Sequence, residues 1–403
     1  MVPGTDTTEN NAFLSMALMA ERQMRKAGLW QGASRDRTHW VAHGLLFILL
    51  TLSGLQVIKL FISFDDLGTL IDCISVLSFV SMGLLKVVSL RLNVAKWHTL
   101  FSKITEMEEN SITDLEYEMP QQTVEKQSRD YTNTIRRILR YLPRIYWCAG
   151  GVFILSPFAE LGLKYFRHLP LEWPHILTIW VPYEDNAYAN VFLILIELLA
   201  AVYVIIVHIA FDVSSLAVMI FMSGQFAKLR WNTEMIGGRD LSESSVSRDD
   251  RAHALIITCH QHYLDLTRLN RHLDSVLNFI MGVYMNVATL NLCATAVQLT
   301  NNLSKIEFLK LVQYMFANLT ELFLFCLFGH YVLHESDIRP GQGPFGAPWW
   351  ALTPRMRQEL LILATGSSRP LELNAGPFNK LNLVSLLSIL QTAYSFYAVL
   401  SNY

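Results

Sequence analysis

Seven long apolar stretches dominate this chain of 403 residues. A helix needs roughly 20 mostly apolar residues to cross the hydrocarbon core of a membrane. Seven candidate spans meet that length: 41–62, 67–90, 141–163, 190–221, 276–299, 308–333 and 381–403. Charged residues make up 16% of the chain, against about 25% in soluble domains. We therefore expect an all-α membrane protein with seven transmembrane helices.

Positive charge is unequally distributed over the segments that join these spans. Lys and Arg number 25 on the side that includes the N-terminal segment and 3 on the other side. Cytoplasmic segments of membrane proteins are enriched in Lys and Arg, so the N-terminus is predicted inside and the C-terminus outside. A G-protein-coupled receptor has as many spans but needs the opposite orientation.

The spacing of spans and charged segments predicts four regions. They are a cytosolic segment at 1–40, transmembrane helices 1–6 at 41–333, a second cytosolic segment at 334–380, and a last helix at 381–403. The charged segments 91–140 and 222–275 are expected to extend the neighbouring spans into the cytosol as helices.

No group of residues forms a catalytic or metal-binding pattern. The stretch GQGPFG at 341–346 follows a membrane helix rather than a strand, which is the wrong context for a phosphate-binding loop. Cys259, His260 and His262 are too close in sequence to share one face of a helix. We expect no enzymatic activity, no cofactor, no metal and no nucleic-acid partner.

Five acidic residues fall inside the candidate spans: Asp72, Glu160, Glu197, Asp212 and Glu321. Ionisable groups are costly in hydrocarbon, so such residues usually face a partner or a wet cavity. Asp72, Glu160 and Glu321 also fit positions near the membrane interface. Glu197 is the best candidate for a pocket or a structural pair.

Aromatic and apolar residues in the outer halves of several spans are candidates for a ligand-binding wall. They are Phe79, Phe153, Phe158, Ile194, Tyr203, Tyr314 and Phe316. Aromatic walls with few polar groups suit a small apolar ligand. For each residue taken alone, packing against lipid or against the protein core is the alternative.

The last span carries a polar stripe. Ser388, Thr392, Ser395 and Asn402 lie near one face of a helix, together with Val399. Such a helix suits a shared water-filled pore with an apolar ring as its gate. Hydrogen bonding between helices of a bundle is the alternative.

The C-terminal third resembles the insect odorant receptor family. The resemblance rests on four stretches and on their order and spacing: ESD at 335–337, PWW at 348–350, RPLELNAGPF at 369–378, and SILQTAYSFYAVL at 388–400. Seven spans with the N-terminus inside agree with the same family across the chain. The upstream spans carry no specific motif.

The resemblance implies a non-selective cation channel opened by a small volatile ligand. Such receptors are similar in plan to four-subunit assemblies in which each subunit contributes its seventh helix to a central pore. The family's pore positions match Val399, Asn402 and Tyr403, beside Ser395 of the polar stripe. The helix at 353–364 and the segment near Arg369 would join the subunits in an anchor domain.

The family also implies a partner subunit. Its shared co-receptor is longer and carries a large insert between spans four and five, which this chain lacks. The chain therefore resembles a ligand-tuning subunit that assembles with the co-receptor in the plasma membrane of a sensory neuron dendrite. A gustatory-type homomeric channel remains an alternative, beside the G-protein-coupled receptor. A transporter usually has internal repeats, which are absent from this sequence.

Overall fold

The chain folds as a bundle of long helices. The computed structural model describes residues 15–26, 28, 37–64, 67–114, 121–170, 173–181, 186–238, 245–300, 304–337 and 342–400. The first helices are α2 (Ser15–Lys26), α3 (Arg37–Ile62), α4 (Leu67–Leu92), α5 (Val94–Asp114), α6 (Gln121–Phe166) and α7 (Ala187–Glu234). They are followed by α8 (Ser245–Gln298), α9 (Lys305–Asp337), α10 (Gln342–Gly346), a 3-10 turn (Trp349–Ala351), α11 (Pro354–Gly366) and α12 (Leu383–Leu400).

Among the described residues, six helices are long and apolar enough to cross a membrane. These candidate spans lie in α3, α4, α6, α7, α8 and α9. The helix α12 is shorter, with 18 residues, which corresponds to a length of about 27 Å. That length approaches the roughly 30 Å of a hydrocarbon core. The prediction of an all-helical multi-pass membrane protein is confirmed.

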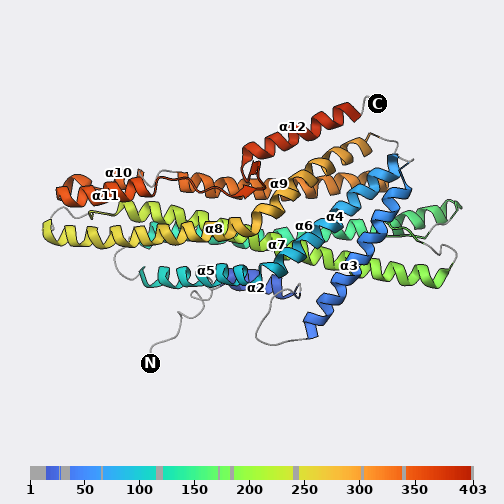
Figure 1. Cartoon of the computed structure of the whole chain (residues 1–403), viewed down its shortest axis with the longest axis horizontal. Coiled ribbons are helices and arrows are strands. Elements are labelled where there is room, and N and C mark those ends of the chain that lie inside the picture. The colour runs from blue at the N-terminus through green and yellow to red at the C-terminus, as the bar shows by residue number, and fades with distance from the viewer. Residues whose placement is uncertain are drawn as a thin grey trace.

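Several helices extend well beyond the length of a membrane span. The helix α7 has 48 residues and α8 has 54. Figure 1 shows α8 running toward α10 and α11 at one end of the molecule, while α12 stands near the opposite end. These extensions lie where the charged sequence between the apolar spans predicts cytosolic helices.

The core of the bundle forms around α7. This helix packs against α6, α9, α8 and α4, and its middle section from Val207 to Met222 is buried at every position. Asn186 begins the helix, because its side-chain oxygen accepts hydrogen bonds from the backbone N–H groups of Tyr188 and Ala189. An apolar helix surrounded by other helices places its few polar groups inside the protein rather than in lipid.

A short β-ribbon connects the bundle to α12. The strands β1 (Asn374–Ala375) and β2 (Asn379–Lys380) pair antiparallel. Gly376 turns the chain between them with a φ of 73° and donates its N–H to the backbone oxygen of Asn278 on α8 at 2.8 Å. A β-carbon at Gly282 of α8 would lie 2.7 Å from the Cα of Gly376. The contact between α8 and the ribbon therefore requires glycine at position 282.

A second close contact fixes the start of the last helix. A β-carbon at Gly329 of α9 would lie 2.4 Å from the backbone oxygen of Leu381. Two residues after Leu381, α12 begins at Leu383, and this helix packs on α8 and α9. Both α8 and α9 thus contact the segment that leads into α12 and α12 itself.

Candidate functional site

A cavity of about 220 Å³ lies within the helix bundle. Residues from α4, α6, α7, α8 and α9 contribute to its wall, together with residues of the segment before α7. Phe79, Phe153 and Tyr314, three of the predicted ligand-binding residues, line it. The rings of Phe79 and Phe153 are 6.4 Å apart between centroids, so they form one aromatic section of the wall.

The other predicted ligand-binding residues lie elsewhere. Phe158 and Phe316 are exposed on the surface of the bundle, and Phe316 is 63% accessible. Tyr203 is buried in the core, and Ile194 lies half-buried on α7. None of these four lines the cavity. A hydropathy pattern places a residue at a depth in the membrane, but it does not fix the rotation of the helix that carries it.

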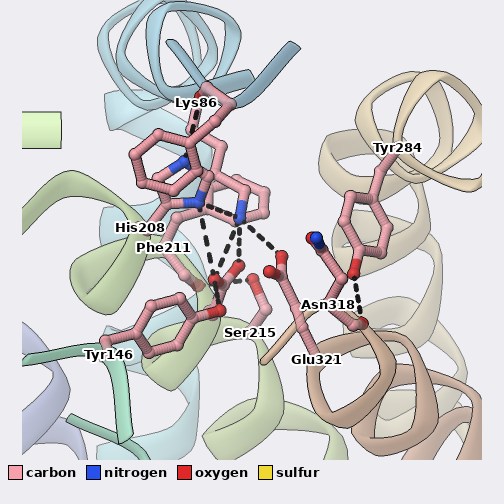
Figure 2. A network of polar contacts seen from close by, with 10 residues as sticks. Lys86, Tyr146, His208, Phe211, Ser215, Tyr284, Asn318 and Glu321 are labelled. Carbon is pink, nitrogen blue, oxygen red and sulfur yellow. Dashed lines mark hydrogen bonds and ion pairs between the residues drawn. The ribbon is translucent and has the colours of Figure 1, made fainter. Parts of the chain in front are cut away.

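A network of charged residues forms the inner end of the cavity. Nζ of Lys86 on α4 lies 2.7 Å from Oδ1 of Asp212 on α7 and 2.9 Å from Oε1 of Glu321 on α9. The side chains of Lys86 and Asp212 are fully buried. Figure 2 shows dashed contacts from the ammonium group of Lys86 to Glu321 and to His208. The network therefore joins three helices by ionic hydrogen bonds inside the bundle.

Two further residues complete the network. Nδ1 of His208 lies 2.8 Å from Nζ of Lys86. An ammonium group can only donate, so Nδ1 must accept, and the imidazole is neutral with its proton on Nε2. Nε2 points to the backbone oxygen of Phe79 at 3.4 Å. The hydroxyl of Tyr146 on α6 donates to Oδ2 of Asp212 at 2.5 Å.

Three residues of this network could in principle supply ligands to a metal ion. His208, Asp212 and Glu321 bring possible ligand atoms within 4.8 Å of one another. The ammonium of Lys86 occupies the position between these atoms and supplies the positive charge that a metal ion would bring. The donor set therefore fits an internal ion pair better than a metal site.

Sequence reasoning missed Lys86 and His208. The signal was present, because Lys86 is a lone cation inside the second apolar span and Asp212 and Glu321 are acids in two others. Opposite charges at similar depth in different spans are candidates for pairing. The sequence could not say which acid Lys86 would contact, since Asp212 is 126 positions away and Glu321 is 235.

The other acids predicted inside the membrane spans also lie at the cavity or form hydrogen bonds with neighbouring segments. Oε1 of Glu197 pairs with Nδ1 of His175 at 2.9 Å, and Oε2 accepts the N–H of Ile176 at 2.7 Å. Glu197 thus anchors the segment before α7 as a structural pair. Asp72 accepts a hydrogen bond from Nε2 of Gln298 at 2.5 Å, and Glu160 lines the cavity beside them.

The predicted pore residues lie on and after α12. Val399 is 58% exposed, and the hydroxyl of Ser395 donates to the backbone oxygen of Gln391. Asn402 and Tyr403 lie outside the described residues. On the single chain, the side chain of Val399 is thus left uncovered by the rest of the bundle.

The fold and the cavity define a multi-pass helical membrane protein with an internal cavity. The family model described as 7tm odorant receptor matches residues 66–394. The chain belongs to the insect odorant receptor family, so it is a receptor rather than an enzyme.

Relatives in Drosophila melanogaster agree with this assignment. Odorant receptor 83a is 26% identical over 147 residues, which are 36% of this chain and 32% of that receptor. Odorant receptor 22c is 31% identical over 156 residues, which are 38% of this chain and 35% of that receptor. The match therefore spans about a third of the length of these relatives.

A solved structure shares the fold over nearly the whole chain. The olfactory receptor OR5 from Machilis hrabei, in complex with eugenol, superposes with a TM-score of 0.81. The superposition covers 97% of this chain and 99% of the other at 16% identity. The same receptor in a second structure gives a TM-score of 0.77, with 96% and 97% coverage. At this identity the likeness establishes the fold.

Proposed function

We propose that this chain is the ligand-tuning subunit of an odorant-gated, non-selective cation channel. A small volatile molecule binds in the cavity between α4, α6, α8 and α9, and binding opens a pore lined by α12 of four subunits. The observation that carries this proposal is the aromatic cavity within a bundle of the odorant receptor fold. Eugenol, which is bound to OR5 of Machilis hrabei, is a small molecule of this kind.

The size of the cavity supports a small ligand. Its volume of about 220 Å³ is below the roughly 300–1,000 Å³ of pockets that take drug-sized molecules. Burial of apolar surface contributes about 25 cal/mol per Å². For a ligand of about ten heavy atoms, this gives micromolar affinity at best.

The path from cavity to pore follows contacts of the described residues. α8 and α9 both contribute to the cavity wall, and both contact the segment that leads into α12. A ligand that binds better to one arrangement of these helices shifts the population toward it. In this account, the shift moves α12 and withdraws Val399 from the pore axis.

The partner is proposed to be the shared co-receptor. The support comes from the sequence, because the segment between α7 and α8 is short and the large insert of the co-receptor is absent. The exposed face of α12 gives the assembly a surface for the pore, with Val399 58% accessible on the isolated chain.

Whole-cell recording tests this function. Cells would express the chain alone, the co-receptor alone, or both, during rapid application of a panel of small volatiles. We expect a fast cation current that requires both chains and differs from the response of the co-receptor alone. Current from the chain alone would favour a homomeric channel. A slow response that depends on G proteins would contradict the proposal.

A further inference from the structure

The charged network has more negative than positive groups. Lys86 brings one ammonium, while Asp212 and Glu321 bring two carboxylates. The geometry of His208 makes its ring neutral, so it adds no positive charge. The three hydrogens of the ammonium face four acceptor atoms: Nδ1 of His208, both carboxylate oxygens of Asp212 and Oε1 of Glu321. Lys86 therefore has no donor left for a further acceptor.

Glu321 is the carboxylate of this network that faces the cavity. It lines the cavity wall, whereas Lys86 and Asp212 do not. Its side chain retains 9% exposure, against 0% for both of those residues. In Figure 2 the dashed contact of Glu321 runs from one carboxylate oxygen to Lys86, and no dashed line reaches the other. The cavity thus ends at a carboxylate that can accept another hydrogen bond.

The opposite end of the cavity is also rich in acceptors. Among the described residues, Oε1 of Gln298 and Oε1 of Glu160 are buried without a hydrogen-bond partner. Both residues line the cavity, and Gln298 is 95% buried. A buried acceptor without a partner costs free energy that a ligand or a water can recover by donating to it. Both ends of the cavity therefore favour a molecule that donates.

The two ends are too far apart for one small ligand. Glu160 and Tyr146 both lie on α6 and both line the cavity, and their separation in sequence corresponds to about 21 Å along the helix. Lys310 lines the outer end and brings positive charge to Glu160. At the inner end, Lys86 is shared between two acids, and Glu321 uses one carboxylate oxygen for it. The other oxygen of Glu321 is therefore the acceptor that a ligand can reach at this end of the cavity.

We propose that the ligand of this receptor carries a hydrogen-bond donor, a hydroxyl or an amine N–H, which it gives to Glu321. Its apolar body lies against Phe79 and Phe153, which line the same cavity. This inference rests on the proposed function and names the chemical class that the receptor selects. Molecules of similar size that can only accept, such as ethers, bind less tightly.

The expected preference follows from the strength of hydrogen bonds to charged groups. Such bonds contribute more than neutral ones, and a carboxylate left facing an ether loses its hydration without gaining a donor. We expect alcohols and amines to bind at least about tenfold more tightly than methyl ethers of similar size.

Matched pairs of probes test the preference on the unmodified chain. The pairs are 2-phenylethanol and its methyl ether, phenol and anisole, and 2-phenylethylamine with the same methyl ether. Binding is measured as the ligand-dependent rise in the unfolding temperature of the detergent-purified chain. We expect the compound with the hydrogen-bond donor to bind more tightly than the ether in each pair. It is overturned if no donor in the panel binds better than its ether.

Two variants with matched chemistry locate the donor site. Glu321→Gln and Asp212→Asn each remove one carboxylate from the same network, but Asp212→Asn keeps the carboxylate that lines the cavity. We expect Glu321→Gln to reduce the preference for the donor by about tenfold, and Asp212→Asn to keep it. An equal loss in both variants would overturn the role of Glu321. If either variant does not fold, the matched pairs on the unmodified chain still decide whether the ligand must carry a donor.

Currents recorded with the same probes separate the two proposals. Equal currents from alcohols and ethers, with equal binding, would leave the channel function standing and overturn the donor inference. Selective binding of donors without any current would overturn the channel function and support the assignment of the cavity.

Discussion

Lys86 and Asp212 form a fully buried ion pair between α4 and α7, with Nζ 2.7 Å from Oδ1. A second acid, Glu321 of α9, lies 2.9 Å from the same nitrogen. Burial of charge costs several kcal/mol per ion unless the partners compensate for it. The network therefore holds three helices at one relative depth, directly beneath the cavity where the ligand is proposed to bind.

Loss of the central cation should destabilise the bundle strongly. In Lys86→Met, the carboxylates of Asp212 and Glu321 remain buried without their ammonium. We expect the free energy of unfolding to fall by about 3–5 kcal/mol, measured by denaturation of the purified chain in detergent. Lys59→Met is the matched control, because Lys59 also lies in an apolar span but is only half-buried. A change as small as that of the control would contradict the account of the network.

The contact between α8 and the β-ribbon should not tolerate a methyl group. In Gly282→Ala, the new β-carbon would lie 2.7 Å from the Cα of Gly376, and neither backbone can move freely. We expect a loss of stability of about 1–3 kcal/mol and a weaker coupling of ligand binding to current. The measurements are the unfolding temperature and the maximal ligand-evoked current. The control is Gly54→Ala, whose β-carbon would meet nothing within 4 Å. Equal unfolding temperatures and equal maximal currents in the two variants would contradict the requirement for glycine at position 282.

The acid Glu108 on α5 should make stability depend on pH. Burial raises the pKa of this carboxyl from 4.5 to about 8, and α5 lies outside the candidate membrane spans. A carboxyl whose pKa is raised in the folded state binds more protons there than in the unfolded chain. Its contribution to the free energy of unfolding is therefore fully present below the pKa that this carboxyl has in the unfolded chain. The contribution declines as the pH rises toward 8.

A pH series on two chains measures this effect. The unmodified chain should lose thermal stability between about pH 4.5 and 8. Glu108→Gln cannot ionise, so its loss over the same range should be smaller. Parallel curves for the two chains would mean that Glu108 does not titrate in this range.

The sequence predicted the spans well because their signal is local. Hydropathy over about 20 residues is read from one segment at a time, and the structure has helices at all seven predicted places. The ribbon was missed because β1 and β2 have two residues each, too few to produce an alternating pattern. Its pairing depends on contacts with residues of α8, which lie far from the ribbon in the sequence.

The candidate site was predicted only in part, and the reason is geometric. Phe153 and Phe158 are five positions apart on α6, yet Phe153 lines the cavity and Phe158 is exposed. Their faces differ because the helix turns about 100° per residue. The rotation of each helix is set by packing with its neighbours. No periodic pattern in an almost wholly apolar span reports that rotation.

The central claim is that α12 lines a cation pore that Val399 closes. The most direct test is the resting current of cells that express Val399→Ser together with the co-receptor. Leu387→Ser is the control, since Leu387 is equally exposed on α12 but lies off the polar stripe. The account predicts a standing cation current without ligand in Val399→Ser and none in the control. An unchanged resting current in Val399→Ser, with normal surface expression, would contradict it.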